Sequence, residues 1–267
     1  MRVFSGKSAL LMLAILLAAT ASPVRAEMTF AWSMETDTPE VYPAGSDSVP
    51  RYYPESIRTT DAAHGGSYSL DISGSYHLGE FANDTNNDVW ALTDEGAISL
   101  WWQYTGTFTG NRMLVMIGGK SSDDELDTNE ALNLVFRNNT TQMRMVYGWI
   151  DGTGYHTTYI TYTNPTSWVQ DQWYHVTMKW DTQAAPSLYL QVDDGTPVTG
   201  GVAIGSTTME AFHQLLWGND TGNSGDGLYL DDVQVWNDFA MTVPEPATAL
   251  LVAVGGLGLA RTRRKRA

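Results

Sequence analysis

The sequence contains no cysteine among its 267 residues. This absence excludes disulfide bridges, cysteine-ligated zinc sites, thiol nucleophiles and thiol redox motifs. If the chain is exported, its folded part must be stabilised by the size of its hydrophobic core, or by a bound metal ion.

The sequence also lacks the common catalytic motifs. It contains no Gly-x-Ser-x-Gly elbow, no His-Glu-x-x-His and no phosphate-binding glycine loop, and its five histidines are scattered. His175 alternates with Thr177 and is assigned to the polar face of a strand. No window of helical length carries an apolar stripe of period 3.6, which argues against a helical domain.

Lysine and arginine are few, and more than half of them lie at the two ends of the chain. Residues 27–243 contain 7 Lys and Arg against 29 Asp and Glu, which gives a formal net charge of −22. Such a surface repels nucleic acid and anionic lipid, so we predict no nucleic-acid partner. It suits calcium, cationic partners or neutral glycans, and the alternative is a solvated acidic surface that only maintains solubility.

The first 26 residues have the three-part pattern of a secretory signal peptide. Arg2 and Lys7 precede an apolar run of 13 residues, 9–21, and the segment ends in Val24-Arg25-Ala26. The run is shorter than the roughly 20 residues that cross a bilayer, which favours a cleaved signal over an uncleaved anchor. We therefore predict passage through the general export machinery and cleavage by signal peptidase after Ala26.

The last 24 residues, 244–267, form a second three-part signal. Its first part, Pro244-Glu245-Pro246, keeps the chain extended because proline cannot continue a helix or a central strand. The apolar run 247–260 is 14 residues long and is a marginal membrane span. The positive-inside rule keeps the basic cluster that follows it in the cytoplasm: Arg261, Arg263, Arg264, Lys265 and Arg266.

This tail resembles the PEP-CTERM signals that exosortases process, in its Pro-Glu-Pro motif, its short hydrophobic helix and its arginine-rich end. The resemblance implies recognition by a membrane exosortase and cleavage near Pro244 to Pro246. It also implies transient anchoring by the helix and delivery to the cell surface or to an exopolysaccharide matrix. An ordinary tail anchor or a nucleic-acid-binding tail would not need the Pro-Glu-Pro segment.

The 217 residues between these signals, 27–243, have the size of one all-β domain. Apolar residues recur there with period two, and turn residues such as Gly65-Gly66 and Asp194-Gly195 separate the runs. The strands predicted in this way are 30–34, 68–72, 98–104, 113–118, 132–136, 143–149, 157–162, 173–180, 188–192, 212–217 and 228–236. Short strands at this spacing predict a two-sheet antiparallel sandwich.

Several segments resemble the jelly roll of the concanavalin A-like lectins and glucanases, in its laminin-G-like branch. The segments follow the order of that family and span most of the domain: 66–72, 98–102, 173–181, 188–195 and 230–236. The family includes lectins, glycan hydrolases and adhesion modules. The resemblance therefore implies the fold without deciding the function.

Glu35, Asp37 and Glu40 have the Glu-x-Asp-x-x-Glu spacing of laminarinase-like members of this superfamily. Retaining hydrolysis needs two carboxylates about 5 to 5.5 Å apart, one ionised and one protonated. Here Pro39 interrupts the motif, and proline cannot donate to a central strand ladder. We interpret the segment as a loop after the strand 30–34 and predict no catalytic residue.

Clusters of Asp and Asn side chains make calcium the favoured metal, because Ca²⁺ takes six to eight oxygen ligands. Three clusters lie at residues 84–88, 123–127 and 220–226. None has the flanking helices of an EF-hand, so a structural calcium is predicted without a recognised loop motif.

The last predicted strand contains a phase slip, because the apolar residues of 228–230 and of 233–235 have opposite parity. The slip predicts a β-bulge at Asp231-Asp232, and bulges often direct a side chain at a site. In many carbohydrate-binding jelly rolls, an acidic residue after the first strand shares a structural calcium with an aspartate of the last. The resemblance implies Glu35 with Asp231 or Asp232 here, and an ordinary bulge with solvated acids is the alternative.

Aromatic residues are abundant, with ten Trp and thirteen Tyr. Trp102 and Tyr174 share parity with apolar neighbours and are expected in the core. Trp101, Trp173 and Tyr189 fall on the opposite phase and are predicted to form a sugar-stacking platform on the outer or concave face. A strand buried on both faces would explain these three equally well.

Three functions are open from the sequence alone. The preferred one is an exported, non-catalytic surface or matrix protein that binds or embeds in extracellular polysaccharide. The second is a glycan-cleaving hydrolase or lyase of the same fold, with carboxylates that the sequence does not identify. The third is a purely structural coat protein.

Overall fold

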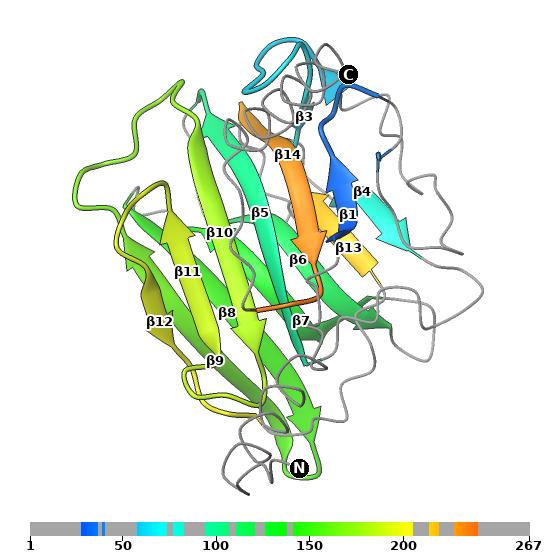
Figure 1. Ribbon diagram of the computed structural model, residues 1–267, viewed down its shortest axis with the longest axis vertical. Coiled ribbons are helices and arrows are strands. Elements are labelled where there is room, and N and C mark those ends of the chain that lie inside the picture. Colours follow the sequence, from blue (N-terminus) through cyan, green and yellow to red (C-terminus); the bar gives the residue numbers. More distant parts are fainter. Residues whose placement is uncertain are drawn as a thin grey trace, which may run out of the picture.

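The computed structural model describes residues 28–36, 39–40, 58–73, 77–82, 94–106, 111–120, 126–137, 141–204, 214–218 and 227–239 (Figure 1). These residues form fourteen β-strands, and all paired strands among them run antiparallel. No helix long and apolar enough to cross a membrane occurs in this part of the chain. The predicted all-β, two-sheet antiparallel sandwich is confirmed. The predicted signal peptide, 1–26, and sorting segment, 244–267, lie outside the described residues.

The strands form two sheets, with sheet A in front in Figure 1. Sheet A contains β1 (Met28–Trp32), β2 (Arg58–Thr59), β3 (Ser69–Asp71), β5 (Glu95–Tyr104), β10 (Tyr174–Asp181), β11 (Leu188–Val192), β12 (Val198–Gly200) and β14 (Leu228–Trp236). Its order is β12-β11-β10-β5-β14-β3-β2, and β1 also pairs with β14. Sheet B contains β4 (His77–Ala82), β6 (Arg112–Lys120), β7 (Leu126–Phe136), β8 (Gln142–Asp151), β9 (Gly154–Thr163) and β13 (Gln214–Gly218). Its order is β4-β13-β6-β7-β8-β9.

Every strand expected from the period-two pattern is present, and three further strands were missed: β2, β4 and β12. β2 has two residues and β12 has three, which is too short for an alternation to be recognised. In β4 the large apolar residues Leu78 and Phe81 have opposite parity, so the strand carries no alternating pattern.

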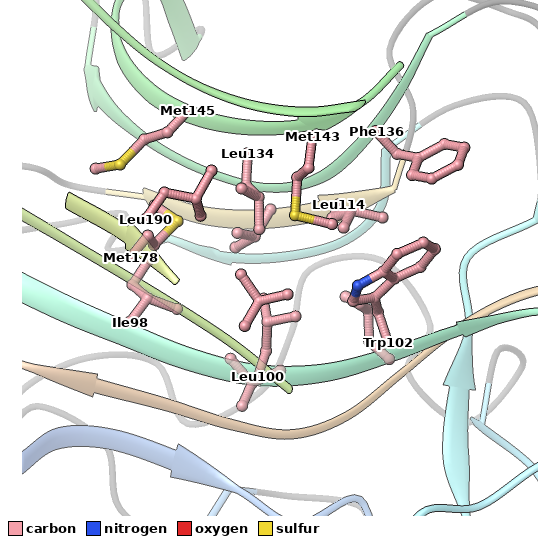
Figure 2. Close-up of a cluster of buried hydrophobic side chains, with 14 of the residues drawn as sticks. Ile98, Leu100, Trp102, Leu114, Leu134, Phe136, Met143, Met145, Met178 and Leu190 are labelled. Carbon is pink, nitrogen blue, oxygen red and sulfur yellow. The ribbon is translucent and has the colours of Figure 1, made fainter. Parts of the chain in front are cut away.

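The core lies between the two sheets (Figure 2). Ile98, Leu100 and Trp102 of β5 point from sheet A toward Leu134 and Met143 of sheet B, and all five side chains are fully buried. Burying one such side chain contributes about 1.5 to 3 kcal/mol. A core of this kind stabilises the domain in the absence of disulfides, as the lack of cysteine required.

Trp102 is the centre of a group of rings at one end of this core. Its ring centroid lies 4.9 Å from that of Phe136, 5.1 Å from that of Trp168 and 5.5 Å from that of Tyr174. The group joins β5, β7 and β10 to Trp168, which lies in the connection between β9 and β10. Trp102 of sheet A therefore packs against sheet B and against the connection between β9 and β10.

The two sheets bend in the same direction, and sheet B lies on the inside of the bend (Figure 2). The outer surface of sheet B is therefore concave and that of sheet A is convex. A ligand that binds to either sheet would contact the residues that point outward from it.

Candidate functional site

The predicted β-bulge in β14 is confirmed. Asp231 pairs with Trp101 of β5 and Gln234 pairs with Ser99. Between these two pairs β14 advances by three residues and β5 by two, so β14 contains one extra residue. Asp232 takes a positive φ of 48° at this point. β3 pairs with β14 before the bulge and β1 pairs with it after the bulge, so Asp231 and Asp232 lie between the ends of these two strands.

The Asp231 carboxylate fixes the chain that leads into β3. It is fully buried, and its Oδ2 accepts hydrogen bonds from the backbone N–H groups of His64 and Gly65 at 2.8 and 3.2 Å. Its Oδ1 accepts the N–H of Asp232 at 2.8 Å. Burial and the nearby Asp232 charge raise the pKa of Asp231 to about 7, although the three backbone donors act in the opposite direction.

Glu35 fixes the same segment from the other side. Its Oε1 accepts the backbone N–H groups of Ser67 and Tyr68 at 2.7 and 3.0 Å. Gly66 lies between these two anchors with φ of 72°, and a Cβ atom there would come within 2.3 Å of Glu35 Oε1. The three predicted metal ligands thus approach one segment, residues 64–68, with Glu35 coming from the loop after β1 and Asp231 and Asp232 from the bulge of β14.

Glu35 and Asp231 already accept hydrogen bonds from backbone N–H groups, so fewer of their oxygen lone pairs are available to a metal ion. Among the described residues, no group of three or more His, Asp and Glu side chains is arranged to hold a metal ion. Calcium at the bulge stays a prediction. The three Asp- and Asn-rich clusters, 84–88, 123–127 and 220–226, lie outside the described residues.

The carboxylates of the Glu-x-Asp-x-x-Glu segment serve different parts of the chain. Glu40 accepts hydrogen bonds from the backbone N–H and the hydroxyl of Ser33, whereas Glu35 holds Ser67 and Tyr68. Asp37 lies outside the described residues. The two described glutamates, Glu35 and Glu40, thus stabilise loops by accepting hydrogen bonds from within the chain.

Trp101 and Trp173, two of the three predicted stacking residues, are brought together by a histidine that the sequence did not single out. The ring of His64 stacks on Trp101 with centroids 3.6 Å apart and planes 13° apart, and meets Trp173 edge-on at 5.9 Å. His175 lies tilted against Trp101 at 4.8 Å. The ring of Trp101 is therefore engaged by two imidazoles, and its role in sugar stacking stays a prediction.

Tyr189, the third predicted stacking residue, lies apart from these rings. It is on β11 opposite Lys179 of β10, whose Nζ is 5.2 Å from the tyrosine ring centroid. Its hydroxyl donates to the side chain of Gln191. Tyr189 thus shares the convex face of sheet A with Trp101 but belongs to a separate cation–π pair.

The pair Ser99 and His175 is polar and buried, and is not a nucleophilic triad. Ser99 Oγ lies 2.6 Å from His175 Nε2, yet only 4% of Ser99 is exposed. Asp193 accepts the backbone N–H of His175, so it does not orient the ring as a triad acid would. Burial lowers the pKa of His175, because it disfavours the charged imidazolium.

The most exposed aromatic side chains of the described residues lie on the concave face, at positions that the sequence analysis did not single out. Tyr155 and Tyr159 of β9 are 54% and 55% exposed, and Ile150 of β8 is 37% exposed. Tyr155 pairs with Ile150 and Tyr159 with Val146, so the four side chains share one face. The sequence did contain a signal for this face. Tyr155 and Tyr159 have odd numbers in β9, whereas the inward Ile160 has an even number, so the two tyrosines point outward.

Arg144 completes this surface. Its guanidinium carbon lies 4.3 Å from the centroid of the Tyr159 ring, and its Nε donates to Thr161 Oγ1 at 3.4 Å. We call Arg144, Val146, Ile150, Tyr155 and Tyr159 the concave patch. It combines two open rings, two aliphatic side chains and one guanidinium, which can contact the apolar and polar sides of a ligand together.

The family comparison addresses the C-terminal segment. Residues 242–265 match the model of the PEP-CTERM protein-sorting motif. The chain carries this sorting motif. The predicted resemblance to PEP-CTERM signals is thus confirmed, and the motif indicates export, C-terminal sorting and processing by an exosortase. No curated protein matches the sequence.

Solved structures with the same arrangement of sheets support the sandwich. The receptor binding domain of botulinum neurotoxin D has a TM-score of 0.56 and 10% identity, over 80% of this chain and 50% of that chain. The binding domain of botulinum neurotoxin DC in complex with SialylT has a TM-score of 0.54 and 10% identity, over 81% and 48%. The chain therefore spans about half the length of these structures, and the likeness concerns the fold.

Proposed function

We propose that the protein is an exported cell-surface or matrix protein whose laminin-G-like sandwich binds extracellular polysaccharide through the concave patch, without cleaving it. The sorting motif supports the location. The observation that carries the binding role is the exposure of Tyr155 and Tyr159 on a concave sheet. Cleavage by the exosortase near Pro244 to Pro246 would leave the sandwich at the surface or in an exopolysaccharide matrix.

The exposed apolar area of the concave patch favours a ligand-binding surface over an ordinary solvated one. Two half-exposed tyrosines beside Ile150 and Val146 leave apolar area in contact with water, and contiguous apolar patches on soluble proteins often mark binding sites. Tyrosine rings offer an apolar face and a polar hydroxyl, which suits the C–H faces and hydroxyls of a sugar. The names of the similar solved structures refer to receptor binding, but at 10% identity they support the fold only.

Glycan retention on a panel of immobilised neutral and acidic polysaccharides tests this proposal. We expect the full-length protein, kept in mild detergent, to be retained by at least one polysaccharide without releasing new reducing ends. Replacing Tyr155 and Tyr159 together with alanine should weaken binding at least tenfold, or about 1.4 kcal/mol. Tyr189→Ala, on the opposite sheet, is the matched control and should bind as the unmodified protein does.

Three results would overturn the proposal. New reducing ends would favour the alternative, a glycan-cleaving hydrolase or lyase. Loss of binding in Tyr189→Ala but not in the double variant would move the site to the convex face, where Trp101, Trp173 and Tyr189 were predicted to stack on sugar. Absence of binding to every polysaccharide would favour a structural coat protein.

Calcium is the second part of the proposal. At the bulge, Asp232 is the candidate with most capacity left, since Glu35 and Asp231 already accept N–H groups. A calcium concentration one hundred times Kd should stabilise the protein by about 2.7 kcal/mol, which corresponds to a rise in Tm of about 5 to 10 °C for a domain of this size. Thermal unfolding with calcium and with a chelator measures this, and Asp232→Asn should abolish the difference. A Tm that does not respond to calcium would remove the metal from the proposal.

A further inference from the structure

We propose that the concave patch recognises an acidic sugar, whose carboxylate pairs with Arg144 while the sugar ring that carries it contacts Tyr159. This inference rests on the proposed glycan binding and adds the chemical class of the ligand. It starts from the surroundings of Arg144, which differ from those expected of an arginine in so acidic a chain.

Arg144 has no acidic neighbour across the strands. It pairs with Val135 of β7 on one side and with Thr161 of β9 on the other. Its contacts are the Tyr159 ring and the Thr161 hydroxyl, and no carboxylate of the described residues pairs with it. Between residues 27 and 243, acidic residues outnumber basic ones by 29 to 7, so an arginine without a carboxylate partner is unexpected.

The two contacts of Arg144 hold its guanidinium while leaving donors available. Arginine carries five N–H donors in a planar fork. Here Nε is directed to Thr161 Oγ1, and the guanidinium carbon lies over the Tyr159 ring. The N–H groups of the two terminal nitrogens have no partner among the described residues. A fork held in this way loses less side-chain entropy on binding, and two parallel N–H groups match the two oxygens of a carboxylate.

The Tyr159 ring beside the guanidinium, with Tyr155 further along the same face, favours a sugar acid over a free anion. Tyr155 and Tyr159 expose about half of their surface on the same face as Arg144. A ligand with a carboxylate on a ring of C–H and O–H groups would use both chemistries at once. The remaining charge of the protein is negative and repels such a polymer at long range, so selectivity must come from the local pairing with Arg144.

The test compares an acidic polysaccharide with its own neutral ester. Polygalacturonate oligomers and their methyl esters share one sugar backbone and differ in the carboxylate charge and one methyl group per unit, and binding of each to the full-length protein is measured by calorimetry. We expect the acid to bind at least tenfold more tightly than the ester. Arg144→Gln should bind both as the unmodified protein binds the ester, and Arg144→Lys should keep only part of the preference because lysine lacks the planar fork.

Lys179→Gln is the matched control. It removes one positive charge that also lies over a tyrosine, but on the opposite sheet, so it reports the effect of net charge alone. We expect the preference for the acid to remain in this variant. Equal loss in Lys179→Gln and Arg144→Gln would assign the effect to net charge and overturn the inference.

Two further outcomes separate this inference from the proposed function. Equal binding of acid and ester by the unmodified protein, with both lost in the Tyr155 and Tyr159 double variant, would retain glycan binding and reject the carboxylate. No binding of any polysaccharide would reject both. A sulfated glucan that binds Arg144-dependently and more tightly than polygalacturonate would also overturn the assignment to a carboxylate. Circular dichroism of each variant checks that the fold is intact.

Discussion

Replacing Trp102 with alanine is expected to lower the free energy of unfolding by about 3 to 5 kcal/mol, the range found for large aromatic residues in well-packed cores. Trp102 is fully buried and contacts the rings of Phe136, Trp168 and Tyr174. The substitution removes the transfer free energy of the indole and leaves a cavity between both sheets, which three large neighbours cannot easily fill. Since domains are stable by about 5 to 15 kcal/mol, the substitution should remove a large fraction of the stability.

Trp101→Ala is the control for this prediction, because the two tryptophans are adjacent on β5 and point to opposite faces. Trp101 is only partly buried, so its removal should cost clearly less than removal of Trp102. Urea unfolding followed by circular dichroism measures both. Equal destabilisation would mean that the convex face carries as much of the packing energy as the core, contrary to the packing described here.

The second large predicted effect is a loss of folding stability as the pH rises, caused by the ionisation of Asp231. Its folded-state pKa of about 7 lies above the ordinary value of 3.8, so between these values the folded protein holds a proton that the unfolded chain has lost. Stability from this group is therefore present below pH 4 and is lost as pH rises toward 7. The loss amounts to about 1.4 kcal/mol for each pH unit of the shift.

Asp231→Asn should remove this dependence. Asparagine keeps one acceptor but turns an N–H₂ group toward a backbone N–H of Asp232 or of the 64–68 segment, so the variant is expected to be less stable at pH 4.5. The deficit should shrink by a few kcal/mol by pH 8, since only the unmodified protein loses stability to ionisation at this site.

The difference between the two unfolding curves is needed because His175 acts with the opposite sign. Burial lowers its folded-state pKa below 6.5, so its contribution to stability is present above pH 6.5 and is lost as pH falls. His175 is common to both proteins and cancels in the difference. Thermal unfolding between pH 4.5 and 8 provides the measurement, and a deficit that does not change with pH would contradict the assignment to Asp231.

The strands and the bulge were predictable because both depend on local patterns. Leu228 and Leu230 share one parity and Val233 and Val235 the other, so the extra residue in β14 could be located before its pairing with β5 was known. The PEP-CTERM tail was recognisable for the same reason, since its three parts are contiguous. In each case neighbouring residues carry the whole signal.

The contacts that give the site its character were not predictable, because they join distant parts of the chain. Glu35 was expected to share a metal with Asp231 or Asp232, yet nothing local indicated that the backbone N–H groups of residues 64–68 would donate hydrogen bonds to both Glu35 and Asp231. The stacking of His64 on Trp101 arises from the same long-range placement. Arg144 and Tyr159 were overlooked because an outward tyrosine among threonines has the polar pattern of an ordinary solvated face.

The pairing of the first strand with the last has a consequence for the order of events during folding. Within the described part of the chain, β1 pairs with β14 alone, and Met28 lies opposite Trp236. β1 therefore has no partner in sheet A until β14, about two hundred residues further along the chain, is available. Pairings this distant in sequence form slowly. Closure of sheet A thus depends on β14, which ends at Trp236, shortly before the sorting motif begins at residue 242.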